Sequence, residues 1–120
     1  MNNLGLRMHE MSLAENVLQI IEDAARTQNF QRVRTVVLEI GALAAVEPDA
    51  MRFCFDAVTH GSIAEGARLE ILDKPGEGWC ADCGKAIFLQ EQYGLCPECG
   101  SVHVEITGGN EMRVKDLEVE

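Results

Sequence analysis

Four of the five cysteines form two Cys-x-x-Cys pairs, Cys80 with Cys83 and Cys96 with Cys99, with twelve residues between the pairs. Two residues between ligands let one tight turn direct both sulfurs to a common point. A glycine follows each pair, where the chain turns back beneath the metal. Four soft thiolates in a tetrahedron suit zinc and leave no open position for catalysis. The pattern therefore predicts a structural zinc site.

Two other uses of paired cysteines are weighed against zinc. A thioredoxin-like redox site needs only one pair, normally at the start of a helix after a strand, so the second pair argues against it. A tetrathiolate iron site has the same spacing and stays open, which makes an electron-transfer protein an alternative. In a reducing cytosol, disulfides are disfavoured and metal ligation is the commoner role of such pairs.

The charge balance excludes several classes of partner. Twenty acidic residues against ten basic ones give a formal charge of −10, which disfavours binding to nucleic acid or to an anionic membrane. The cysteine segment itself carries Asp82, Glu91 and Glu98 against Lys85 alone. No apolar run reaches the roughly 20 residues that span a bilayer, and residues 1–7 lack the apolar core of a secretory signal. We therefore expect a cytoplasmic protein.

A second candidate metal site is the segment Met8-His9-Glu10. In a chain that begins with Met-His, the free amine, the histidine amide nitrogen and the imidazole form fused chelate rings. Such rings favour planar nitrogen coordination, which suits Ni(II) or Cu(II). The other two histidines are not expected to bind metal. His60 is expected at a helix end, where the helix dipole favours positive charge, and His103 at the surface or a hinge. Cys54 is expected to be a small buried hydrophobe.

The elements that would position these residues follow from hydrophobic periodicity. We expect a loose arm over residues 1–8 and a helix over 13–28 that begins with a capping box of Ser12 and Glu15. Strands are expected over 32–40, 68–73 and 112–119, the last with an irregularity near Asp116, and a second helix over 48–60 begins at Glu47-Pro48. The cysteine segment covers about residues 79–103, and Trp79 and Phe88 are expected to pack against the zinc site or the hinge.

This order of elements predicts an α+β fold, with two helices packed on a three-stranded sheet and a four-cysteine zinc-ribbon domain inserted before the last strand. The expected domains are the arm over residues 1–8, a discontinuous domain over 9–76 and 108–120, and a zinc-binding domain over 77–107. The glycines near 76–78 and 108–109 would form the two hinges.

Several segments together resemble the HypA/HybF family of hydrogenase nickel-incorporation proteins. The cysteine pairs alone are common to many zinc ribbons, but their combination with Met-His-Glu is far more specific. The resemblance covers about residues 8–119. Its segments are 8–13 (MHEMSL), 40–41 (IG), 46–48 (VEP), 53–56 (FCFD), 65–67 (EGA), both cysteine pairs and 108–112 (GGNEM).

The resemblance implies a nickel metallochaperone, not an enzyme. It implies that transported Ni(II) is held by Met8, His9 and Glu10, with Glu47 assisting, and that structural Zn(II) is held by the four paired cysteines. The implied partners are a GTPase of the HypB type and the precursor of the large subunit of nickel–iron hydrogenase, with urease accessory proteins for some members. The sequence leaves open whether the chain forms a homodimer.

One departure from the family pattern touches the nickel site. Seven residues precede Met8, so that a peptide bond replaces the free amine. A translation start at Met8 is the favoured explanation; an added arm, or weaker binding through His9, backbone amides and carboxylates, are the others. The competing function is a zinc-ribbon adaptor for protein assembly, without a transported metal.

Overall fold

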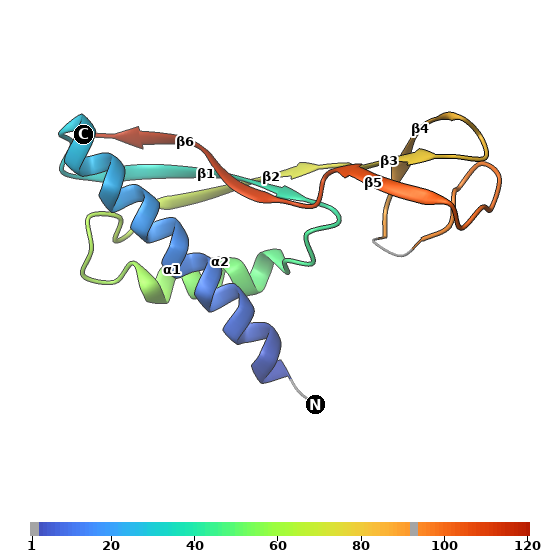
Figure 1. Cartoon of the computed structure of the whole chain (residues 1–120). Helices are drawn as coiled ribbons and strands as arrows, with labels where there is room; N and C mark the ends of the chain where they lie inside the picture. Colours follow the sequence, from blue (N-terminus) through green and yellow to red (C-terminus); the bar gives the residue numbers. More distant parts are fainter. Residues whose placement is uncertain (1–2, 92–93) are drawn as a thin grey trace. The chain divides into compact units, whose positions relative to one another are not determined.

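The computed structural model of the chain describes residues 3–91 and 94–120, with side chains described from His9 onward. Residues 1–2 of the expected arm lie outside the described part. The strands form two three-stranded sheets, one in the order β2-β1-β6 and the other in the order β4-β3-β5 (Figure 1). The elements are α1 (Asn3–Gln28), β1 (Val33–Gly41), α2 (Pro48–Val58), β2 (Arg68–Lys74), β3 (Gly76–Cys80), β4 (Lys85–Leu89), β5 (Val104–Gly108) and β6 (Met112–Val119).

The predicted fold class is confirmed. Both helices lie on one face of the β2-β1-β6 sheet, and α1 packs against α2 (Figure 1). The central strand β1 is rich in β-branched residues, and its alternate residues Val36, Leu38 and Ile40 are buried. Alternate residues of a strand point to one face, so this spacing directs the apolar side chains towards the helices. Helix α2 contributes Met51, Cys54 and Phe55 to the same core.

The predicted start of the first helix is wrong. Helix α1 begins at Asn3, ten residues before the expected position, and runs through residues 3–8 of the expected loose arm. Ser12 lies inside this helix, so it forms no capping box with Glu15. The glycine at position 5 and the absence of a clear apolar period concealed the first turns. Although α1 has 26 residues, no helix in the described part of the chain is long and apolar enough to cross a membrane.

The start of α2 follows the prediction, and its end comes slightly earlier. The carboxylate of Glu47 caps the helix by accepting the backbone N–H of Asp49 at 2.7 Å, with Pro48 in the first turn. The helix ends at Val58, because Thr59 takes the C-cap position, and His60 therefore lies beyond the helix. In β6, the alternation of burial slips at Lys115-Asp116, and the Asp116 side chain accepts the N–H of Leu117, which confirms the predicted irregularity.

The second sheet was not predicted from the sequence. Strand β3 pairs antiparallel with both β4 and β5, and its buried residues alternate with exposed ones. A small core beneath this sheet contains Leu43, Ile87 and Leu89 with the buried sulfurs of Cys80 and Cys96. The cysteine segment therefore forms a sheet with its own small core, and the loops of this sheet carry the cysteines. Trp79 and Phe88, expected to be packed, are exposed.

The chain forms two compact units. One contains the residues up to Leu38 with Val46–Glu70 and Val114–Glu120, and the other contains Glu39–Ala45 and Ile71–Arg113. Within the second unit, glycine backbones make close contacts. A Cβ atom on Gly41 would lie 2.1 Å from the carbonyl oxygen of Gly109, and one on Gly109 would lie 2.2 Å from that of Pro75. Any side chain larger than hydrogen would force the backbone apart.

Candidate metal centre

The second unit brings the four paired cysteines together. Cys80 ends β3 and Cys83 lies in the turn before β4, while Cys96 and Cys99 lie in the loop before β5. All four sulfurs lie within 4.8 Å of one another. The Sγ atoms of Cys80 and Cys99 are 3.6 Å apart, and those of Cys83 and Cys96 are 3.8 Å apart.

These separations fit a tetrahedral metal site. A disulfide would require about 2.05 Å between sulfurs, and all five cysteines are free thiols. A tetrahedron with Zn–S bonds of about 2.3 Å places its sulfurs about 3.8 Å apart. The cluster can therefore receive a zinc ion at its centre. Because the four thiolates would complete its coordination, that ion would stabilise the fold and would not activate a substrate.

The two Cys-x-x-Cys-Gly segments adopt the same local structure. In each, the glycine N–H donates to the carbonyl of the first cysteine at 2.8 Å, and the glycines Gly84 and Gly100 have φ values of 67° and 75°. A backbone N–H also points at the first sulfur of each pair, from Cys83 to Cys80 at 3.3 Å and from Glu98 to Cys96 at 3.4 Å. These donors stabilise the thiolate form that binds metal.

The surroundings of Cys96 favour its deprotonated, thiolate form. Burial would raise the pKa of the Cys96 thiol, but the backbone N–H groups of Glu98 and Cys99 outweigh burial and lower it to about 7. The Cys83 thiol hydrogen-bonds to the Cys99 sulfur, and this contact, with burial, raises the pKa of Cys83 above its usual range. Metal binding must therefore displace the proton that Cys83 holds.

Polar contacts tie the two cysteine turns to each other, and the sequence analysis missed them. The carboxylate of Asp82 accepts a hydrogen bond from the Ser101 hydroxyl and lies 3.0 Å from Nδ1 of His103. Both contacts lower the pKa of Asp82, and the hydrogen bond from the Ser101 hydroxyl has the larger effect. Lys85 and Glu98 form a second bridge of 2.5 Å. The sequence does indicate these contacts by position, because Asp82 and Glu98 each lie between the two cysteines of a pair.

In the first unit, the Met-His-Glu segment is helical. His9 is exposed, whereas Glu10 is completely buried. Glu10 stands four residues before Ala14 and seven before Val17, and it therefore belongs to the core-facing stripe of α1, which ends at Ile21. The sequence analysis missed this burial because it started the helix at residue 13. The Met8 side chain lies outside the described part.

Glu10 connects the first helix to the start of the second. Its Oε2 atom accepts the backbone N–H of Glu47 at 2.9 Å, while its Oε1 atom is buried without a partner among the described residues. Of the four predicted nickel residues, the structure thus places Glu10 directly against Glu47. The side chain of Glu47 is exposed and occupied as the N-cap of α2. A buried carboxylate oxygen with no donor has a free acceptor site.

The remaining candidate residues have ordinary surroundings. Cys54 is buried in the core of the first unit, as expected. His60 is exposed and pairs with Glu65 at 3.0 Å. His103 is at the surface, as expected, in the contact with Asp82.

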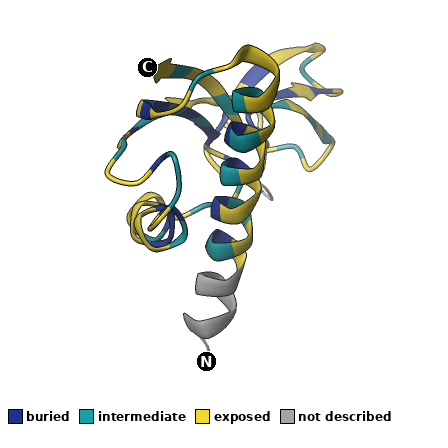
Figure 2. Ribbon diagram, turned by 90° about the vertical axis from the view of Figure 1, so that its left-hand side faces the viewer, coloured by how far each residue is buried: buried dark blue, intermediate teal, exposed yellow. Residues whose placement is uncertain are grey.

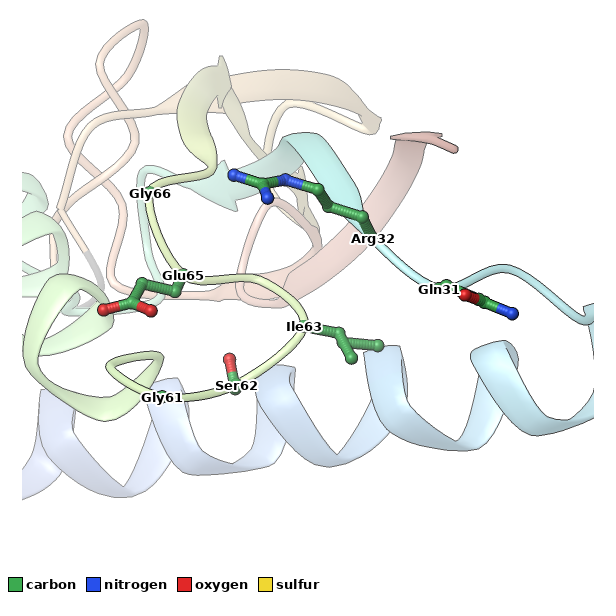
Figure 3. A pocket seen from close by; sticks show the side chains of 7 residues that line it. All are labelled: Gln31, Arg32, Gly61, Ser62, Ile63, Glu65 and Gly66. Atoms are coloured by element: carbon green, nitrogen blue, oxygen red, sulfur yellow. The ribbon is translucent and has the colours of Figure 1, made fainter.

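An open hollow of about 550 Å³ in the first unit contains none of the predicted site residues. Arg32 lies on the chain that leads into β1, and Glu65 lies on the loop after α2 (Figure 3). The Ser62 hydroxyl in this loop donates to the Thr59 carbonyl and accepts the N–H of Ala64. This hydroxyl stabilises the turn. Neither of its hydrogen-bond partners is a general base that could activate it as a nucleophile. The other lining residues are Gln31, Gly61, Ile63 and Gly66.

Known proteins are similar to almost the whole length of this chain. Residues 8–119 match the family model described as "Hydrogenase/urease nickel incorporation, metallochaperone, hypA". The chain is 61% identical over 113 residues to a hydrogenase maturation factor HypA from Dechloromonas aromatica and 54% identical to one from Azotobacter vinelandii. Each match covers 94% of this chain and all of the relative.

A solved structure supports the same relationship. The solution structure of the Ni metallochaperone HypA from Helicobacter pylori matches with a TM-score of 0.69 and 30% identity, over 92% of this chain and 96% of that one. This family consists of maturation factors and not of enzymes. The chain belongs to the HypA family of hydrogenase and urease nickel-incorporation metallochaperones.

Proposed function

We propose that this protein binds Ni(II) at its Met-His-Glu segment and delivers it during the maturation of nickel–iron hydrogenase, with urease as a second recipient. One observation carries the proposal beyond family membership. The buried carboxylate of Glu10 holds the backbone of Glu47 next to the helix that presents His9 to solvent. Residues from two distant segments, both named by the family resemblance, thereby lie in one region.

The exposed position of His9 suits a carrier. An imidazole at the surface can take up an ion and release it without local unfolding, whereas a buried cage would retain it. In the same region, Glu10 has a buried carboxylate oxygen without a partner among the described residues, and Glu47 has an exposed carboxylate; these supply the oxygen ligands of the proposal. We assign His9 as the principal ligand, with Glu10 and Glu47 assisting and Met8 contributing backbone nitrogen.

Nickel binding through backbone nitrogen atoms would be favoured in a chain that begins at Met8. Within a continuous α-helix, the N–H groups of His9 and Glu10 are directed at carbonyls one turn earlier and are not available to a metal. The first four N–H groups of any helix lack such partners. A chain that starts at Met8 would therefore free these amides and would also supply an amine for a planar nitrogen chelate.

The cysteine cluster is assigned to resident zinc, held by Cys80, Cys83, Cys96 and Cys99. Its support is the separation of the four sulfurs and the N–H groups that point at them. We propose that this zinc-binding domain covers residues 77–107 and the nickel-binding domain covers 9–76 and 108–120, preceded by the arm of 1–8. Free thiolate ligands require a reducing compartment, which supports a cytoplasmic location.

The proposed partners are proteins. The sequence contains no glycine-rich phosphate loop, so a nucleotide-driven step would come from a GTPase of the HypB type. The recipients would be the hydrogenase large-subunit precursor and, for urease, its accessory proteins. The net charge of −10 disfavours nucleic acid and anionic membrane as partners.

Nickel titration of matched variants tests the proposal. The His9→Ala variant should lose tight nickel binding and keep its zinc and its fold, because His9 is exposed. The His60→Ala variant is the control, since His60 is also an exposed histidine of the same unit. Stoichiometric nickel binding of unchanged affinity by His9→Ala would refute the assignment.

A second pair of proteins tests the backbone argument, one starting at Met1 and one at Met8. X-ray absorption should find more nitrogen ligands, and titration a higher affinity, in the shorter protein. Zinc without any nickel in equilibrium dialysis of both proteins would favour the adaptor alternative. A strong visible absorption band of the purified protein would instead identify iron in the thiolate cluster.

A further inference from the structure

The β4-β3-β5 sheet has a solvent face that its own unit does not cover. Along β3, Gly76, Gly78 and Cys80 are buried, whereas Glu77 and Trp79 between them are exposed. The register pairs Glu77 with Phe88 and Trp79 with Ala86 on β4. Figure 1 labels the three strands, and Figure 2 shows buried and exposed positions along the ribbon. Directly paired residues share one face, so these four residues form a single surface, here named the aromatic face.

The aromatic face exposes two large aromatic side chains to water, and this exposure is energetically unfavourable while nothing is bound. The exposed fractions are 45% for Trp79 and 70% for Phe88, and the register makes the two residues diagonal neighbours across β3 and β4. A hollow of about 250 Å³ lies beside Phe88, with Glu77 and Thr107 among its lining residues. Exposed aromatic residues next to a small hollow are typical of the central contacts of protein interfaces.

The four residues of the aromatic face carry only acidic charge, and the two cations that share a hollow with Glu77, Lys74 and Arg113, both pair with Glu39. Glu77 also lines the hollow beside Phe88, and Glu105 on β5 is paired in register with Trp79. Among the described residues, neither carboxylate forms an ion pair, while Lys85 at the start of β4 is held by Glu98. The faces of aromatic rings also attract cations. Carboxylates and ring faces together select a ligand with positive charge and aliphatic carbon.

We propose that the aromatic face is a docking site for a segment of a partner protein in which arginine or lysine alternates with aliphatic residues. The cationic group enters the hollow between Glu77 and Phe88, and its aliphatic stem and neighbours cover Trp79. Long basic side chains combine an apolar stem with a charged end and therefore match both features. This inference is independent of nickel binding, and its test uses none.

The chain's only tryptophan provides the readout, since Trp79 lies on the aromatic face. The zinc-loaded protein is titrated with a capped pentapeptide of alternating leucine and arginine, and separately with the same peptide carrying glutamate in place of arginine. The basic peptide should shift the tryptophan emission to shorter wavelength in a saturable manner, and its affinity should fall as salt rises. The acidic peptide should cause no shift.

Variants localise the binding. Phe88→Ala and Glu77→Gln should each weaken the basic peptide about tenfold or more, as interface anchors do. Phe53→Ala, an exposed aromatic of α2, is the aromatic control, and Glu15→Gln, an exposed acid of α1, is the acidic control; both should bind as the wild type does. The absence of saturable binding, equal binding of the acidic peptide, or wild-type affinity in both Phe88→Ala and Glu77→Gln would overturn the proposal.

Discussion

The cysteine cluster and the Met-His-Glu segment are two candidate metal sites built in opposite ways. The cluster uses four side chains from two duplicated turns, supported by backbone N–H groups and by a sheet of its own. The segment uses one exposed imidazole on a helix, with a buried carboxylate beside it. Under the proposed assignment, this difference explains how one chain could keep zinc and release nickel. Retention needs many fixed ligands, whereas release needs few ligands and an open surface.

The largest effect should come from removing one ligand of the cluster. In Cys96→Ser, we expect the zinc to be lost and the second unit to unfold, because structural zinc contributes on the order of 10 kcal/mol. Zinc analysis and NMR signals from residues 71–113 would measure this. Cys54→Ser is the control, since Cys54 is buried but lies outside the cluster. A variant Cys96→Ser that retains one tightly bound zinc would break the comparison.

A second prediction asks whether metal alone holds the second unit together. Gly109→Ala should cost about 3 kcal/mol or more, because its Cβ would collide with Pro75 and its φ is 77°. Gly61→Ala is matched to it, with a φ of 78° and no atom within 4 Å of the added Cβ, and should cost only about 1 kcal/mol. Urea unfolding of the zinc-loaded proteins measures both. Equal losses would show that the crowding of the glycines is unimportant.

A third prediction concerns the segment. Glu10→Ala should lower the free energy of unfolding by about 1–3 kcal/mol, because the N–H of Glu47 loses its acceptor. Glu10→Gln should lose less, since its amide oxygen can accept the same hydrogen bond. Glu15→Ala, an exposed change on the same helix, controls for helix propensity. Both Glu10 variants should keep zinc, and stability equal to that of Glu15→Ala would contradict the anchoring role of Glu10.

The smallest effect should come from Asp82. Its pKa lies below the ordinary value of 3.8 in the folded protein, so its stabilising contribution is complete above that value and is lost as the pH falls through the lowered pKa. Asp82→Asn should therefore lower Tm slightly and by the same amount at pH 8 and pH 9. Glu91→Gln, an exposed acid of the same unit, should not change Tm. A difference that grows between pH 8 and pH 9 would assign the effect to another group.

The sequence predicted the features that depend on local patterns. Spacing identified the four cysteines, the β-rich run from Arg32 to Ile40 predicted β1, and Glu47-Pro48 predicted the start of α2. It also predicted the fold class, because the order of elements leaves few arrangements of helices on a sheet.

What it could not predict depends on long-range contacts. The burial of Glu10 is coupled to a backbone N–H 37 residues later, and no local pattern reports such a pairing. The second sheet joins β3 to β5 across the cysteine segment, through short strands with little apolar alternation. Trp79 and Phe88 were expected to pack against the zinc site or the hinge, yet they lie on the exposed side of this sheet, which could not be predicted without its register.

The interleaved connectivity also sets an order of assembly. Strand β6, which completes the β2-β1-β6 sheet, follows all four clustered cysteines in the chain. During synthesis, the ribosome therefore releases every thiolate ligand before the last strand of the helix-bearing sheet becomes available. Four thiols can therefore bind a metal ion while that sheet still lacks an edge strand, so the proposed zinc centre can form before the fold is complete.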